Sequence, residues 1–120
     1  MEDERERNEE ANESIRFSCY TPRTKIAQHR NIRVLGNQLL RCGTSVGANY
    51  RASCRAKSQA DFIAKMGIVE EEADESMYWM ELLVEAGLVQ MNEVTELVDE
   101  ANQIVAIIVS SINTARGNKR

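Results

Sequence analysis

The chain has 120 residues with a formal net charge of −4, and its hydrophobic residues, 42% of the total, include few aromatics. This length suffices for one domain with its own core, and an interior built from Leu, Ile, Val, Met and Ala favours helices over sheets. No apolar run approaches the ~20 residues of a membrane span and no signal-peptide pattern follows Met1, so we expect a cytoplasmic protein with no membrane partner.

The first part of the chain is strongly charged. Residues 1–16 carry seven acidic and three basic side chains. Ile15, Phe17 and Tyr20 add little apolar surface, and Pro22 would break a helix running through it. Thr21 and Pro22 could also start a new helix, as its N-cap and first residue. We therefore predict a mobile or loosely helical segment over 1–16, one helical domain over 17–116 and a short basic tail over 117–120.

An amphipathic helix is predicted around residues 32–50, where apolar residues recur three and four positions apart. Its apolar row is Ile32, Leu35, Leu39, Cys42, Val46 and Tyr50. A patch of small residues lies on the same helix, namely Gly43, Ser45, Gly47 and Ala48. A glycine costs about 1 kcal/mol relative to alanine inside a helix, so this patch predicts close packing against another helix or another subunit.

The next helix is predicted between Ser58 and Gly87. Ser58 and Asp61 have the spacing of an N-terminal cap, and Gly87 stands where a helix-ending glycine belongs. The apolar row consists of Phe62, Met66, Val69, Ala73, Ser76, Met80 and Leu83. An acidic stripe, whose members fall within roughly 60° of one another on the helix, consists of Glu70, Asp74, Glu81 and Glu85.

The last helix is predicted between Asn92, as N-cap, and Gly117, as the stop. Its apolar row is Val94, Leu97, Ala101, Ile104, Ile108, Ser111 and Ala115. The short link from Gly87 to Asn92 predicts that the last two helices lie antiparallel. Three helices with wide apolar faces need a fourth partner, which the first thirty residues supply poorly and another subunit could supply.

Charge is divided along the chain. Residues 17–65 carry nine basic residues against one acidic, whereas residues 66–102 carry eleven acidic residues and no basic one. On the predicted helix around 32–50, a basic stripe within roughly 80° consists of Arg30, Arg33, Arg41, Arg51 and Arg55. These arginines can pair with the acidic stripe of the next helix or of a neighbouring subunit, or they can stay free to bind the phosphates of a nucleic acid.

No catalytic site, metal site or cofactor is predicted. The acidic run at 70–75 lacks the Glu-x-x-His pairs of di-metal carboxylate sites, because His29 is the single histidine. Ser45 is expected in the middle of a helix with no histidine base in reach. Tyr78 and Trp79 are interpreted as core or interface aromatics rather than as a platform for stacking bases.

The three cysteines do not predict a disulfide. Cys19, Cys42 and Cys54 form no Cys-x-x-Cys pair. On a shared helix, Cys42 and Cys54 would lie roughly 18 Å apart, which is too far for a bond between them. We therefore expect free thiols in a reducing compartment.

The stretch from 38 to 83 resembles the bacterial four-helix-bundle family known as the 23S rRNA intervening-sequence proteins. The residues that carry the resemblance are Gln38 to Arg41, Thr44 to Asn49, Asp61 to Ile63 and Tyr78 to Leu83. The resemblance implies a cytosolic bundle of four antiparallel helices, assembled as a homopentamer and without an established activity for most members. It also implies a distant similarity to accessory proteins of diversity-generating retroelements, which bind nucleic acid through a basic surface.

The expected protein is therefore an all-α, antiparallel up-and-down four-helix bundle with a weak first helix. It is expected to be an oligomeric, non-enzymatic accessory protein that binds RNA or another nucleic acid, with no small-molecule substrate. The candidate binding residues are Arg33, Arg41, Arg51, Arg55 and Lys57, and the candidate packing residues are Gly43, Ser45, Gly47, Tyr78 and Trp79. The alternative is a structural homo-oligomer or protein–protein adaptor without nucleic-acid binding.

Overall fold

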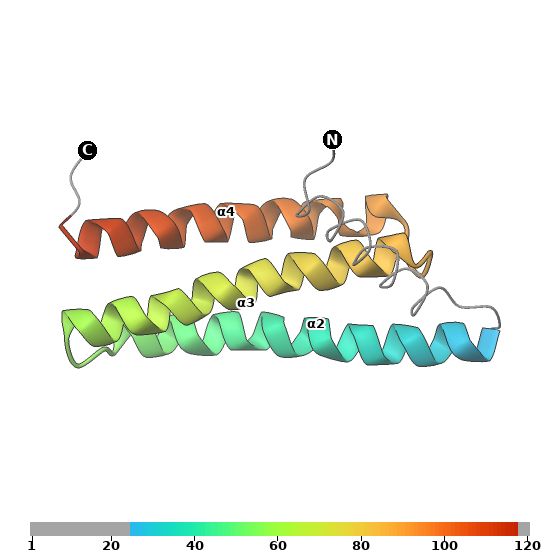
Figure 1. Ribbon diagram of the computed structural model, residues 1–120, viewed down its shortest axis with the longest axis horizontal. Coiled ribbons are helices and arrows are strands. Elements are labelled where there is room, and N and C mark those ends of the chain that lie inside the picture. Colours follow the sequence, from blue (N-terminus) through green and yellow to red (C-terminus); the bar gives the residue numbers. More distant parts are fainter. Residues whose placement is uncertain (1–24, 118–120) are drawn as a thin grey trace, which may run out of the picture.

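The computed structural model describes residues 25–117 of the protein. This part consists of three long helices, α2 (Lys25–Cys54), α3 (Gln59–Glu85) and α4 (Met91–Ala115). The helices lie side by side with α3 between the other two, and consecutive helices run in opposite directions (Figure 1). Consequently α2 and α4 run in the same direction. Within the described range there is no strand, which confirms the all-α class.

The predicted weak first helix and the charged segment over 1–16 fall in residues 1–24, which lie outside the described residues, as do residues 118–120. The count of four helices is therefore not confirmed. Among residues 25–117, no helix combines the length and the apolar content that crossing a membrane requires.

The ends of α3 follow the predicted signals. The backbone N–H of Asp61 donates to Ser58 Oγ at 3.0 Å, and the Asp61 carboxylate accepts from the backbone N–H of Lys57 at 3.0 Å. At the other end Gly87 has φ +72°, a conformation that glycine adopts without strain. The N–H groups of Gly87 and Leu88 donate to the carbonyls of Val84 and Leu83, both at 3.0 Å, and thereby close the helix in a Schellman motif.

Two other helix starts differ from the prediction. The helix α2 begins at Lys25, well before the apolar row from Ile32 that suggested it. The N-cap of α4 is Gln90, which makes no side-chain capping bond, so the prediction of Asn92 was wrong. Val89 packs against the core immediately before Gln90, and this contact sets the start of α4 without a polar cap. The predicted stop was correct, since Gly117 follows α4 with φ +76°.

The core follows α3, whose predicted apolar row is buried from Met66 to Leu83. At one end Met66 and Val69 pack against Ile108 and Ile112 of α4. At the other end Leu82 and Leu83 pack against Leu35 of α2. Met80, Val94 and Ala101 form the cluster in between, with Leu39 of α2 packed against it. Because α3 contributes to all three clusters, it is the helix that joins α2 and α4.

On one side of α3, the helices α2 and α4 leave an apolar groove of about 370 Å³. The residues that line it are Leu39, Leu40, Gly43, Thr44, Val46, Ala73, Ser76, Met80, Leu97, Glu100, Ala101 and Ile104. Leu40 and Leu97 remain 65% and 51% exposed. Leu97, Ile32 and Tyr50, which belong to the predicted apolar rows, are 51%, 42% and 51% exposed and are thus not part of the core that α2, α3 and α4 form.

Candidate nucleic-acid interface

Arg41 differs from the other arginines of α2 because it is bound to α3. Its Nη2 lies 2.6 Å from Glu75 Oε1 and its Nη1 lies 3.3 Å from Glu72 Oε2. These two carboxylates do not belong to the acidic stripe that the sequence suggested as a partner. Among the described residues, the stripe members Glu70, Asp74 and Glu81 form no ion pair. One predicted nucleic-acid contact is thus already used inside the bundle.

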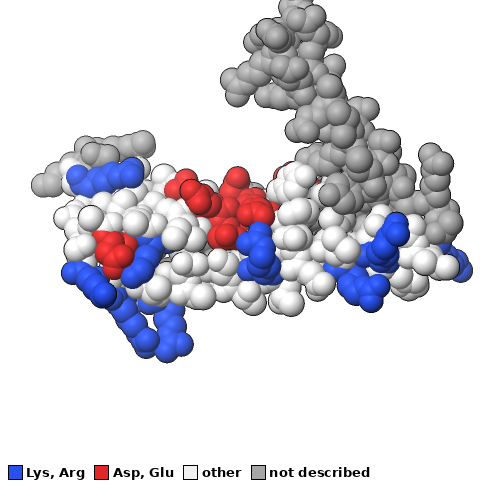
Figure 2. All heavy atoms as spheres, turned by 60° about the horizontal axis from the view of Figure 1, so that its bottom comes forward, with Lys and Arg blue, Asp and Glu red and all other residues white. Residues whose placement is uncertain are grey.

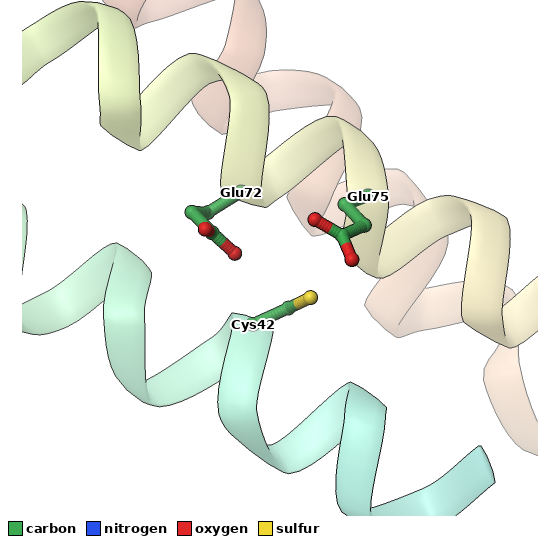
Figure 3. A group of neighbouring side chains, drawn as sticks. All are labelled: Cys42, Glu72 and Glu75. Carbon is green, nitrogen blue, oxygen red and sulfur yellow. The ribbon is translucent and has the colours of Figure 1, made fainter.

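The thiol of Cys42 completes this group. It is fully buried and points into the space between Glu72 and Glu75 (Figure 3). Burial, together with hydrogen bonding to Glu72 and the charge of Glu75, raises the pKa of the Cys42 thiol to about 11. Arg41 Nη2 donates to its sulfur at 3.2 Å. The group therefore contains a neutral thiol and one guanidinium that is shared between two carboxylates.

This group is also the place where the described residues could hold a metal ion. One ligand atom from each of Cys42, Glu72 and Glu75 lies within 4.8 Å of the others. Thiolate and carboxylate ligands occur together in zinc sites. Here, however, the guanidinium of Arg41 already pairs with both carboxylates. The arrangement is accounted for as an ion-pair network between α2 and α3.

The remaining basic side chains of α2 are exposed and form separate groups. Arg51, Arg55 and Lys57 lie at the end of α2 and in the turn that follows. Arg33 lies eighteen residues before Arg51, which is roughly 27 Å along the helix. None of these four forms an ion pair with another residue of the described range. Figure 2 shows basic side chains in separate groups along this face, with acidic side chains beside the group at the centre and beside that at the left.

The group formed by Arg51, Arg55 and Lys57, called here the basic turn, has a local structural cause. Arg51 lies in the last turn of α2, where positive charge stabilises the negative end of the helix dipole. Helix α2 contains no acidic residue, so no side chain of the same helix neutralises the positive charge of this group. Nearby, Lys65 is paired with Asp61 at 2.8 Å. Among the described residues at this end of α2, the positive charges without an ion-pair partner are therefore those of the basic turn.

The predicted packing residues fall into two sets. Gly43 lines the groove, and neither Gly43 nor Gly47 has an atom within 4 Å of where a side-chain carbon would stand. The close neighbour that these glycines predicted is therefore absent from the described part of the chain. Ser45 accepts a hydrogen bond at its Oγ from Asn49 Nδ2 at 3.0 Å, within the same helix. No base for a nucleophile is found there.

Tyr78 and Trp79 belong to the packing of α3. Their rings meet edge to face, with centroids 5.0 Å apart. Trp79 packs against the cluster of Leu35, Leu82 and Leu83, and its Nε1 donates to Glu75 at 3.2 Å. The sequence pointed to these aromatics but missed Glu72 and Glu75, which lie three residues apart beside the acidic stripe.

Within residues 25–117, a three-helix core with an apolar groove and a basic helix end defines a small helical-bundle protein. The chain belongs to the family of 23S rRNA-intervening sequence proteins, because the family model matches residues 7–110. A crystal structure from Bacteroides thetaiotaomicron, of a protein with unknown function from the S23 ribosomal protein family, is similar to it with a TM-score of 0.65. The two are 30% identical, over 81% of this chain and 94% of that one. No curated protein matches the chain.

Proposed function

We propose that this protein is a homo-oligomeric accessory protein that binds RNA or another nucleic acid and has no catalytic activity. The observation that carries the proposal is the basic turn, in which Arg51, Arg55 and Lys57 are exposed and have no ion-pair partner among the described residues. Arginine binds two phosphate oxygens at once, which makes such a cluster better suited to phosphate than to a single carboxylate.

Membership of the family supports the same proposal. The family is named for intervening sequences of 23S rRNA, which is consistent with a nucleic-acid partner. In the refined proposal, the basic turn and Arg33 bind phosphates whereas Arg41 does not. Five subunits are the assembly that the family resemblance implies, and the cytoplasm is the compartment.

The test is a salt titration of binding to a structured RNA, followed by fluorescence anisotropy. Each lost phosphate contact lowers the slope of log K against log salt by about 0.7 to 0.9. The double variant Arg51→Gln/Arg55→Gln should lose two phosphate contacts, so its slope should fall by about twice this amount. Its helical circular dichroism should equal that of the wild type.

Arg41→Gln is the matched control, because it removes the same charge from a side chain already paired with α3. Its salt slope should equal that of the wild type. If the wild type bound neither RNA nor DNA at low salt, the proposal would fail and the alternative, a structural homo-oligomer or adaptor, would remain. The apolar groove among α2, α3 and α4 is the observation that favours this alternative.

A further inference from the structure

Two basic groups lie on one face of the helix α2. Arg33 and Arg51 are separated by about five full turns, so their side chains leave α2 in the same direction. Arg55 belongs to the basic turn and follows directly after the helix. Because α2 is unbroken from Lys25 to Cys54, it holds the two groups roughly 27 Å apart. The helix is thus a rigid spacer between two sites for phosphate.

The stretch between the two groups has no free positive charge. Exposed positions on the same face carry the uncharged side chains of Asn37 and Thr44. Arg41 lies near the midpoint, but its guanidinium is paired with Glu72 and Glu75 of α3. The side chains of these two glutamates are 18% and 39% exposed. Two carboxylates against one guanidinium give the middle of the face a formal negative charge, and Figure 2 shows acidic side chains beside the basic group at its centre.

This pattern of charge is unfavourable for a single-stranded nucleic acid. A single strand that ran from one basic group to the other would carry a phosphate at every nucleotide and would bring several of them past the carboxylates of Glu72 and Glu75. Proteins that bind single strands combine a continuous basic groove with aromatic side chains on which the bases stack. Tyr50, the one Phe, Tyr or Trp of α2, points about 100° away from the line through Arg33 and Arg51.

A double helix meets the same face in a different way. Its sugar–phosphate backbones approach a straight rod laid along the duplex at intervals, with a groove between them. One turn of B-DNA is about 34 Å long and one turn of A-form RNA is somewhat shorter, so long arginine side chains on sites roughly 27 Å apart can reach backbone segments one turn apart. The uncharged and acidic middle of the face then lies opposite a groove, where it meets no phosphate.

We infer that the nucleic acid of the proposed function is a double helix that lies along α2 and is held at two points, by Arg33 and by the basic turn. The carboxylates of Glu72 and Glu75 between these points select against a single strand. The inference rests on the proposed function and names the class of its ligand. RNA and DNA duplexes share the spaced phosphates on which it depends, so the experiment includes both.

The first experiment varies the length of the duplex in a salt titration followed by fluorescence anisotropy. Two hairpins share one loop and differ in their stems, of about five and about 16 base pairs. The short stem is about 17 Å long at a rise of about 3.4 Å per base pair and cannot span both groups. The long stem has the length that a double-stranded-RNA-binding domain covers. Both hairpins are made as RNA and as DNA.

Arg33→Gln should lower the slope of log K against log salt by about 0.9 on the long stem and leave the slope on the short stem unchanged. The short stem binds at the basic turn, which carries more charge than the Arg33 site. A length-dependent loss with RNA alone identifies an RNA duplex as the ligand, and one with DNA alone identifies a DNA duplex. Arg116→Gln is the matched control, because it removes an exposed charge just after α4, and it should change neither slope.

The second experiment removes the negative middle of the face. The wild type should bind the long stem at least about tenfold more tightly than a single strand of about 16 nucleotides. Glu72→Gln/Glu75→Gln frees Arg41 and should strengthen binding of the single strand about tenfold, with a much smaller effect on the long stem. Asp74→Asn/Glu81→Gln is the matched control, because it makes the same change of charge on the acidic stripe, where neither residue pairs with α2. Circular dichroism establishes that each variant is folded.

Three results would overturn the inference while the proposed function stood. The first is a single strand that the wild type binds as tightly as the long stem. The second is an effect of Arg33→Gln that is the same on both stems, and the third is an unchanged single-strand affinity in a folded Glu72→Gln/Glu75→Gln variant. A wild type that bound neither duplex nor single strand at low salt would instead remove the proposed function itself, so the two failures are distinguishable.

Discussion

Arg41 on α2 and Glu75 on α3 form an ion pair of 2.6 Å. The same guanidinium also pairs with Glu72 and donates a hydrogen bond to the buried sulfur of Cys42. This pair lies at the middle of the α2–α3 contact and divides the basic face of α2 into two groups. The arginine that is most central in the sequence stripe is thus the one least available to an external anion.

The first prediction concerns the stability of this network. Arg41→Gln leaves two carboxylates side by side near a buried thiol, and we expect the free energy of unfolding to fall in a urea titration. The side chain of Arg41 is 48% exposed, so solvent screening limits the effect. Arg30→Gln, which removes a charge of α2 with no ion-pair partner among the described residues, should change the stability by less than half as much. Equal losses would contradict the network.

The second prediction concerns pH. Burial raises the pKa of the Cys42 thiol from 9.0 to about 11, so the unfolded chain loses this proton at a lower pH than the folded chain does. Stability should therefore be full below pH 9 and decline as the pH rises from 9 to 11. Cys42→Ser removes this thiol and should flatten that part of the stability profile relative to wild type. Identical profiles would show that Cys42 does not titrate in this way.

The third prediction concerns glycine. Gly87 has φ +72°, so Gly87→Ala should lower the free energy of unfolding by about 1 kcal/mol or more. Gly67 lies inside α3 with open space around it, and Gly67→Ala should raise it by about 0.5 to 1 kcal/mol. Thermal melts of both variants test the pair. A gain for Gly87→Ala would be inconsistent with the helix end described above.

The fourth prediction concerns residues 1–16. Their side chains carry little apolar surface, so deleting them should lower the melting temperature by less than about 5 °C, which corresponds to about 1 kcal/mol in a domain of this size. Differential scanning calorimetry of the truncated and full-length proteins measures the change. A larger drop would mean that the segment docks as a fourth helix.

Within residues 25–117, the sequence was sufficient to identify the three helices and most of the core. Periodicity identified α3 and α4, and the residues Ser58, Gly87 and Gly117 identified helix ends that depend on local backbone chemistry. Asn92 failed as a cap because the packing of Val89 determines where α4 begins. A tertiary contact of this kind has no local signal.

The candidate site was less predictable. The arginines of α2 were found as a set, but which of them would be paired depended on how α2 and α3 are rotated about their own axes. That rotation is set by Leu35 packing against Leu82 and Leu83, and it turns Glu72 and Glu75 rather than the acidic stripe towards Arg41. A helical wheel gives the faces of one helix and carries no information on the rotation of its neighbour.

The central position of α3 has a consequence for how the chain folds. Every extensive helix pair in residues 25–117 joins neighbours in sequence, α2 with α3 and α3 with α4, while α2 and α4 stay apart on either side of the groove. Such a topology has a low contact order, because neither hairpin must wait for a distant segment to close a long loop. Both helical hairpins contain α3, so substitutions in its buried row should slow folding. Substitutions at the outer edges of α2 and α4 should mainly speed unfolding.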